Sequence, residues 1–178
     1  MSTDTPIYSP EPDDPQAFTE RFDDEYTKIA GVYDVAVRWL PVWKTWLRES
    51  LPHIEGPRVL EASFGTGYLL TQYADRVEAH GIDYNDRMLE VAQANLDRLG
   101  LDAELRQADI AALPYDDATF DCVVNTMALS GYPDGDAAMG EIRRVLRPGG
   151  ALVLIDVAYP HDGNWIGTRM TRAWASAG

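Results

Sequence analysis

The chain has 178 residues, which is enough for one domain with a buried core. Its 29 acidic residues against 15 basic ones give a formal charge of −14. Such a surface repels nucleic acid and anionic membranes, so we expect neither as a partner. A single cysteine, Cys122, excludes a disulfide within the chain and a cysteine-based metal site. Because no apolar run could span a bilayer and the polar N-terminus is unlike a signal peptide, we predict a cytoplasmic protein without membrane insertion.

The N-terminal part divides into two predicted segments. Residues 1–16 are rich in proline and acid, which predicts a flexible acidic tail. Residues 17–56 are expected to be helical and to act as a lid region, with Pro41 separating two helices. Four apolar residues could share one helical face: Val35, Trp39, Trp43 and Trp46. This stripe either packs over the rest of the domain or forms the wall of an apolar substrate pocket.

The most informative segment lies at residues 58–70, where an apolar strand ends in a carboxylate, turns through glycines and opens a helix. Glu61 stands at the end of the strand, and Gly65 and Gly67 make the turn. Sixteen residues past Gly67, a second predicted strand ends at Asp83. An acid at this place is suited to accept hydrogen bonds from the two hydroxyls of a ribose. The arrangement is therefore typical of a nucleotide-cofactor site.

The glycine spacing indicates which nucleotide is bound. A dinucleotide site needs G-x-G-x-x-G, but Leu70 occupies the third glycine position. Glu61 would repel a diphosphate at the neighbouring helix N-terminus, whereas it would favour a ligand that carries an ammonium group and a sulfonium. S-adenosylmethionine carries both. A nicotinamide-dependent oxidoreductase is the alternative, against which the missing glycine and the lack of a Tyr-x-x-x-Lys pair argue.

These residues resemble the first motif of the class I S-adenosylmethionine-dependent methyltransferases, an acid followed by x-G-x-G-x-G. Ser63 takes the place of the first glycine, and because serine disfavours a positive φ we expect a slightly altered turn. The resemblance continues, in the order of the family, at residues 81–89, 108–124 and 144–154.

The resemblance implies a role for each matching residue. Glu61 would hold the methionyl ammonium, Asp83 the ribose hydroxyls and Asp109 the adenine amino group. Met88 would lie near the adenine, the Ile110 amide would meet a ring nitrogen, and Asn125 would line the path near the methyl group. The predicted cofactor-binding residues are Glu61, Ala62, Ser63, Gly65, Gly67, Asp83, Tyr84, Met88, Asp109, Ile110 and Asn125. For the strand-end acids and Asn125, an ordinary structural role is the alternative.

From residue 58 onward, strands and helices alternate, which predicts an α/β fold: a doubly wound, Rossmann-like parallel sheet with helices on both faces. Asn85 is expected to cap a helix that keeps a 3.6-residue apolar period, through Leu99, until Gly100. Strand three is expected at residues 103–108. We assign residues 57–178 to an S-adenosylmethionine-binding methyltransferase domain.

The predicted C-terminal end is short for this class. Such methyltransferases usually follow the fifth strand with a helix and an antiparallel hairpin, yet only about twenty residues follow Val157. We therefore expect strands six and seven to be absent and residues 164–177 to form one amphipathic helix. The fifth strand would then be an open edge. A homodimer could cover this edge; otherwise this end of the chain would be poorly ordered.

The protein's expected contribution to methyl transfer is to position the two reactants. A sulfonium already makes the methyl group electrophilic, so the protein mainly holds an acceptor in line with the methyl group and the sulfur. Two residues are weak candidates for a catalytic role. His161 lies just past strand five, and Tyr33 lies in a segment that resembles the ubiquinone and menaquinone C-methyltransferases and related phospholipid N-methyltransferases. A solvated loop histidine and a packed tyrosine are the alternatives.

No cluster in the sequence has metal-ligand spacing, so we expect no metal. We predict an S-adenosylmethionine-dependent methyltransferase that acts on a small, partly apolar acceptor and releases S-adenosylhomocysteine. A protein that binds the cofactor without turnover, or that serves a partner subunit, is the alternative.

Overall fold

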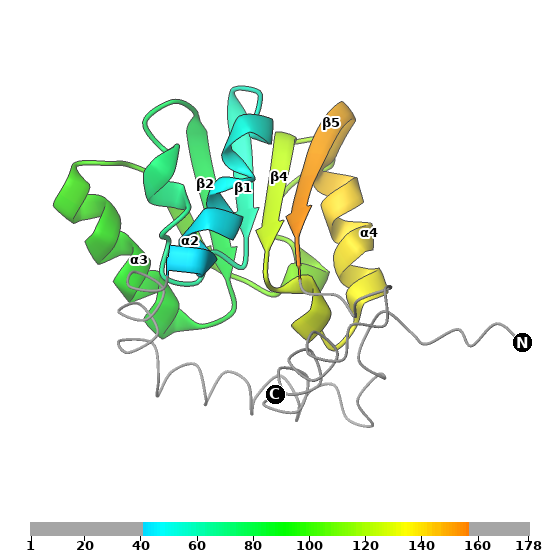
Figure 1. The fold of residues 1–178 in the computed structure, drawn as a ribbon. Helices are drawn as coiled ribbons and strands as arrows, with labels where there is room; N and C mark the ends of the chain where they lie inside the picture. The colour runs from blue at the N-terminus through cyan, green and yellow to red at the C-terminus, as the bar shows by residue number, and fades with distance from the viewer. Residues whose placement is uncertain (1–40, 157–178) are drawn as a thin grey trace, which may run out of the picture.

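The computed structural model describes residues 41–156 (Figure 1). The predicted tail at residues 1–16, Tyr33, His161 and the predicted C-terminal helix at 164–177 lie outside the described residues. Five strands form one sheet in the order β3-β2-β1-β4-β5, and every neighbouring pair is parallel. The strands are β1 (Arg58–Ala62), β2 (Glu78–Asp83), β3 (Glu104–Gln107), β4 (Phe120–Thr126) and β5 (Leu146–Ile155).

Helices cover both faces of this sheet (Figure 1). They are α2 (Pro41–Arg48), α3 (Asp86–Leu99) and α4 (Gly135–Val145), with 3₁₀ turns η1 (Leu51–His53), η2 (Leu70–Gln72), η3 (Ile110–Ala112) and η4 (Leu129–Gly131). On one face, α2, α3 and η2 pack against Val59 and Val124. On the other face, α4 and η3 pack against Leu60 and Val123. Successive strand residues therefore feed two cores, as expected for strands buried on both faces. The predicted doubly wound α/β fold is confirmed.

The helix α3 agrees with the sequence prediction in its ends. The Asn85 side chain accepts a hydrogen bond from the Met88 amide at 3.0 Å and caps the helix. Gly100 ends it in a left-handed conformation with φ of 66°. The predicted apolar face is one turn too long, because Leu99 is 53% exposed while Leu96 is fully buried.

The helix expected after β1 is largely replaced by turns around η2. The amides of Thr71 and Ala74 donate to carbonyls four residues earlier, so single helical turns are present. The amides of Gln72 and Tyr73 instead donate to carbonyls three residues earlier, so α-type and 3₁₀ turns alternate and no continuous helix forms. The Thr71 hydroxyl donates to the Tyr68 carbonyl at 2.7 Å, a bond that regular helices also contain.

The helix α2 begins at Pro41, the residue expected to separate two helices. Its buried face differs from the predicted stripe. Trp46 is 45% exposed, whereas the next residue, Leu47, is 6% exposed and packs into the core below. Trp46 therefore does not follow the packing alternative, and the side chains of the other three stripe residues lie outside the described part of the chain.

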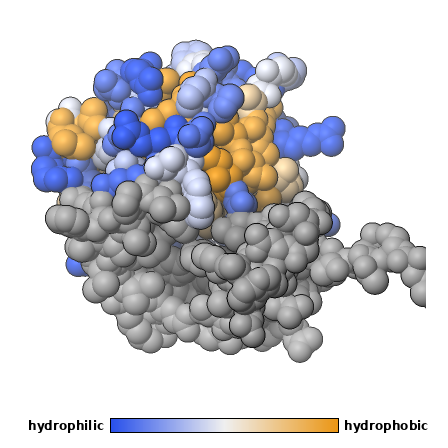
Figure 2. Space-filling view, viewed as in Figure 1, coloured by the Kyte–Doolittle hydropathy of each residue, from blue (hydrophilic) through white to orange (hydrophobic). Residues whose placement is uncertain are grey.

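Within residues 41–156, β5 pairs with one strand only, β4, and so lies at an edge of the sheet. Leu154 of β5 is 42% exposed. Figure 2, which is viewed as in Figure 1, shows an apolar surface in the region of β4 and β5. The described part therefore has the expected strand edge, while a second subunit on it stays a prediction. None of the helices described here is long and apolar enough to cross a membrane.

Candidate functional site

Polar residues gather where β1, β2 and β4 end. The register pairs Ala62 of β1 with Ile82 of β2 and with Asn125 of β4, so these ends lie at one edge of the sheet. Here Glu61, Asp83 and Asn125 are 2%, 9% and 0% exposed. From the central strand β1, the chain proceeds to β2 on one side and returns later to β4 on the other. This point is where doubly wound sheets bind their ligands.

The turn after β1 keeps the glycine conformation at Ser63. Its φ is 60°, so the backbone geometry is retained and the serine carries the strain. A left-handed conformation costs a residue with a Cβ atom about 1 kcal/mol. The expected alteration of the turn is therefore not seen. The Ser63 amide donates to the Ile82 carbonyl at 2.8 Å, which holds the turn against β2.

The two glycines of the turn serve different purposes. A Cβ atom on Gly67 would lie 2.8 Å from the Cβ of Ala92, so its absence lets the turn pack against α3. A Cβ atom on Gly65 would meet no atom of residues 41–156 within 4 Å. Gly67 and Gly65 both have left-handed φ values, 69° and 55°. The described residues thus leave space beside Gly65 for a ligand that approaches the backbone.

Glu61 is a buried carboxylate without a basic partner among the described residues. Its Oε2 atom accepts a hydrogen bond from the Tyr73 hydroxyl at 2.9 Å. Burial raises the pKa of Glu61 to about 8, although the bond from Tyr73 lowers it in part. Burial also raises the pKa of Tyr73 well above its usual value, which keeps its hydroxyl a donor. A ligand cation at this end would therefore stabilise the charged form of Glu61.

Asp83 connects the turn to the start of α3. Its Oδ2 atom accepts from the Gly65 amide at 2.8 Å, and its Oδ1 atom accepts from the Asn85 amide at 3.1 Å. A carboxylate offers about four acceptor positions, so acceptance from these two amides does not by itself prevent contact with ribose hydroxyls. The structure thus gives Asp83 a structural role that does not preclude the predicted one.

The predicted adenine-side residues lie beside Asp83. The Ala108 amide donates to the Asp83 carbonyl at 3.0 Å, which brings the following loop to this edge. Asp109 is exposed and accepts from the Ala111 amide at 2.9 Å, so it caps η3. Further members of this side are Ile110 (7% exposed), Met88 (2%) and Tyr84 (43%). Only Tyr84 and Asp109 present much side-chain surface.

Arg144 fixes this loop, a role that the sequence reasoning missed. Its guanidinium donates to the carbonyls of Leu113 and Tyr115 at 3.0 and 2.7 Å. It also pairs with Glu141, which accepts from the Leu113 amide at 2.7 Å. One ion pair on α4 thus anchors the adenine-side loop.

Tyr132 is the second residue that the sequence reasoning missed. Its hydroxyl lies 2.7 Å from the Ser63 hydroxyl and accepts from the Asn125 amide nitrogen at 2.7 Å. It follows η4, seven residues after Asn125 but 69 residues after Ser63, so no spacing rule indicates its contact with Ser63. The available signal was Ser63 itself, because a serine at a glycine position calls for a compensating contact.

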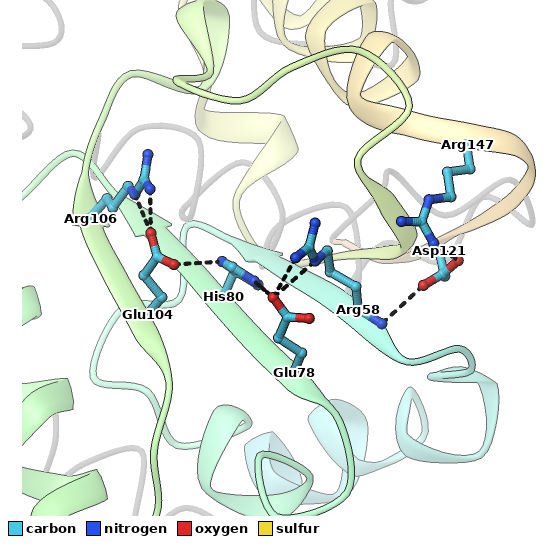
Figure 3. A network of polar contacts seen from close by, with 7 residues as sticks. All are labelled: Arg58, Glu78, His80, Glu104, Arg106, Asp121 and Arg147. Atoms are coloured by element: carbon cyan, nitrogen blue, oxygen red, sulfur yellow. Dashed lines mark hydrogen bonds and ion pairs between the residues drawn. The ribbon is translucent and has the colours of Figure 1, made fainter.

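The opposite edge holds a different group of charges (Figure 3). His80 is 7% exposed and lies between Glu78 and Glu104, with nitrogen–oxygen distances of 3.1 and 3.5 Å. These residues belong to the amino-terminal halves of β2 and β3, away from the glycine turn. Within residues 41–156, no three His, Cys, Asp or Glu side chains are placed to hold a metal.

Comparison with known proteins identifies the family. A family model for the methyltransferase domain matches residues 59–150, a range that includes Glu61, Asp83 and Asn125. The chain belongs to this family. The family match, together with similarity to curated methyltransferases, confirms the predicted resemblance, and S-adenosylmethionine is the methyl donor that the family implies.

Two curated relatives and one crystal structure illustrate the similarity. The ubiquinone/menaquinone biosynthesis C-methyltransferase UbiE of Idiomarina loihiensis is 33% identical over 148 residues, 77% of this chain and 59% of that protein. The phosphatidylethanolamine N-methyltransferase of Cereibacter sphaeroides is 38% identical over 113 residues, 61% of this chain and 56% of that protein. A methyltransferase structure from Aquifex aeolicus, 18% identical, has a TM-score of 0.59 over 83% of this chain and 75% of that chain. The chain thus spans less than two thirds of the two curated relatives.

Proposed function

We propose that the chain binds S-adenosylmethionine at the carboxyl edge of its sheet and transfers the methyl group to a small, partly apolar acceptor by direct in-line displacement. The observation that carries this proposal is Glu61. A buried carboxylate without a basic partner in the described residues, next to an open glycine turn, suits a cationic ligand and disfavours a phosphate. Membership of the methyltransferase-domain family supports the same cofactor.

In this proposal each residue binds or orients. Glu61 holds the methionyl ammonium, Asp83 takes the ribose hydroxyls, and Asp109 with the Ile110 amide takes the adenine. The cofactor supplies an electrophilic methyl group through its sulfonium, so the chain need only place the acceptor and exclude water. Neither histidine in residues 41–156 lies at the carboxyl edge, so neither of them is placed to act as a base there.

The two curated relatives narrow the acceptor. Their names indicate methyl transfer to carbon in quinone biosynthesis and to nitrogen of phosphatidylethanolamine. Both names denote compounds with a large apolar part, although the methylated atoms differ. We infer an acceptor of this kind, with a quinone precursor as the first candidate.

Calorimetric titration of the full chain tests the cofactor. We expect S-adenosylhomocysteine to bind and NAD not to bind under the same conditions. Binding of NAD without binding of S-adenosylhomocysteine would overturn the proposal.

Transfer is then tested with labelled S-adenosylmethionine. The chain is incubated with either a short-chain demethylmenaquinol or vesicles that contain phosphatidylethanolamine. Label in either lipid identifies the acceptor class. Cofactor binding without transfer to either probe would favour the alternative in which the protein retains the cofactor without turning it over.

The expected homodimer is a separate proposal, which the exposed edge of β5 supports. Sedimentation of the full chain tests it, because a monomer at every accessible concentration would contradict it.

A further inference from the structure

Ser63, Tyr132 and Asn125 form one hydrogen-bonded unit at the carboxyl edge. The residues come from the turn after β1, the segment after η4 and the end of β4. The Ser63 and Tyr132 hydroxyls are 2.7 Å apart. The Asn125 amide nitrogen donates to the Tyr132 hydroxyl at 2.7 Å and to the Ala62 carbonyl at 3.1 Å. The turn after β1 therefore meets two later segments, which lie seven residues apart in the sequence, at one hydroxyl.

The unit fixes the orientation of the Asn125 side chain. Both of the amide nitrogen's contacts are to oxygens, and a flipped amide would set Oδ1 against the Ala62 carbonyl. The Oδ1 atom is buried and has no hydrogen-bond partner among the described residues. An acceptor that is buried and unpaired is costly, so such atoms in folded proteins usually receive a donor. The loaded site is the natural source of that donor.

The same unit gives a reason for serine, rather than glycine, at position 63. A glycine would adopt the left-handed conformation of Ser63 without strain, and the serine adopts it at a cost. What the serine adds is a hydroxyl that reaches Tyr132. Of the two hydroxyl protons, one lies between the two residues and the other is left for a ligand or solvent.

The sheet order places this unit on one side of the proposed cofactor site. Asp83 and the loop at 109–110 lie on the β2 and β3 side, where the ribose and the adenine are assigned. Asn125 and Tyr132 lie on the β4 side of β1. The part of the cofactor left for the β4 side is its amino-acid end, whose ammonium group is a donor.

We propose that Ser63 and Tyr132 are positioning residues that hold Asn125 so that its Oδ1 atom accepts a hydrogen bond from the amino-acid end of S-adenosylmethionine. This inference rests on the proposed function. Asn125 contacts the ligand, whereas Ser63 and Tyr132 act through it.

Two ligands separate this role from a merely structural one. S-adenosylhomocysteine carries the amino-acid end, and 5′-methylthioadenosine shares its adenosine and sulfur but lacks that end. We expect Ser63→Ala and Tyr132→Phe each to weaken S-adenosylhomocysteine binding by about threefold to tenfold and to leave 5′-methylthioadenosine binding unchanged. The double variant should lose no more than either single variant, because both remove one unit. General loosening of the site would weaken both ligands alike and would overturn the inference.

Ser63→Gly keeps the test valid if Tyr132→Phe does not fold. Glycine relieves the strain and removes the hydroxyl, so we expect an unfolding midpoint at least as high as in the unaltered chain together with weaker S-adenosylhomocysteine binding. Unchanged or tighter binding in Ser63→Gly would overturn the inference.

Tyr115→Phe is the matched control. The Tyr115 hydroxyl is buried without a hydrogen-bond partner in the described residues, and its ring packs on Phe120 with centroids 4.8 Å apart. Its removal should change binding of neither ligand. If the unaltered chain fails to bind S-adenosylhomocysteine, the proposed function fails. If the unaltered chain binds and the Ser63 and Tyr132 variants bind equally well, only this inference fails.

Discussion

The two edges of the same sheet treat acidic side chains differently. At the amino edge, basic partners surround the acids: Glu78 with Arg58, Glu104 with Arg106 and Asp121 with Arg147 (Figure 3). At the carboxyl edge, Glu61 is buried, and its one described hydrogen-bond partner is the neutral Tyr73. At the amino edge, the protein's own arginines thus pair with these acids.

This difference indicates where a ligand is needed. Arg58 and Arg147 satisfy the amino edge whether or not anything is bound, so its charges need no further partner. The pKa of Glu61 is raised because burial disfavours its charged form, and no cation within residues 41–156 offsets this. We therefore expect the amino edge to contribute to folding stability and the carboxyl edge to contribute to ligand binding. Substitutions of the same kind at both edges test whether the two edges differ in this way.

The largest contrast is expected between Asp83→Ala and Asp121→Ala. Each carboxylate accepts a backbone amide, from Gly65 at 2.8 Å and from Arg58 at 3.0 Å. Asp83→Ala should lose most S-adenosylhomocysteine binding, by about a hundredfold or more, because the ribose loses its acceptor and the glycine turn its anchor. Asp121→Ala should lower the unfolding midpoint and leave calorimetric affinity unchanged. Equal losses of affinity in both variants would remove the distinction between the edges.

A smaller effect is expected for Glu61→Gln, which removes the charge and keeps the shape. Hydrogen bonds to charged groups contribute about 1.5–3 kcal/mol, so S-adenosylhomocysteine affinity should fall by about tenfold to a hundredfold. The free energy of unfolding near pH 8 should rise, because glutamine, unlike glutamate, has no charged form that burial disfavours in the folded state. The control is Glu78→Gln at the amino edge, which should not alter affinity. Unchanged S-adenosylhomocysteine binding in Glu61→Gln would contradict the proposal that Glu61 holds the ammonium group of the ligand.

The titration of Glu61 gives a prediction in pH. Its pKa is about 8 in the folded chain against 4.5 as its ordinary value, so between these two pH values the folded state holds a proton that the unfolded state has released. This group therefore stabilises the fold most below pH 4.5, and that contribution falls by up to about 1.4 kcal/mol per pH unit as the pH rises to 8. The difference in unfolding free energy between the unaltered chain and Glu61→Gln, measured from pH 5 to 9, isolates it. A difference that is flat across this range would contradict the raised pKa.

Binding should show the opposite trend with pH. An ammonium ligand prefers ionised Glu61, so binding at pH 7 should release close to one proton, and affinity should rise with pH by up to about tenfold per unit until pH 8. Calorimetry at pH 7 in buffers of different ionisation enthalpy measures the released proton. Proton uptake, or none, would be inconsistent with an ammonium beside Glu61.

Much of this site could be predicted from the sequence because local patterns encode it. An apolar strand that ends in Glu61, and a second that ends in Asp83, place two acids at one edge of any parallel sheet. Asn85 and Gly100 mark the ends of α3 because caps depend on neighbouring residues alone. These features hold regardless of what packs around them.

The remaining features depend on contacts between distant segments. Tyr132 reaches Ser63 across 69 positions of sequence, and no periodicity indicates such a pair. The helix predicted after β1 is replaced by alternating α-type and 3₁₀ turns, which the apolar pattern of the sequence does not distinguish from a helix. The exposure of Trp46 is set by how α2 meets the core, which spacing alone does not determine.

The smallest effect is expected from Glu78 itself, and it sharpens the comparison from the amino edge. Its carboxylate pairs with Arg58 at 2.7 Å and is bonded to His80, but its side chain is 54% exposed. Water and salt screen such a pair, so Glu78→Gln should shift the unfolding midpoint only slightly, and less at high salt than at low salt. Thermal unfolding at two ionic strengths measures this. A large, salt-independent loss of stability would mean that the amino edge depends on its charges as strongly as the carboxyl edge depends on a ligand.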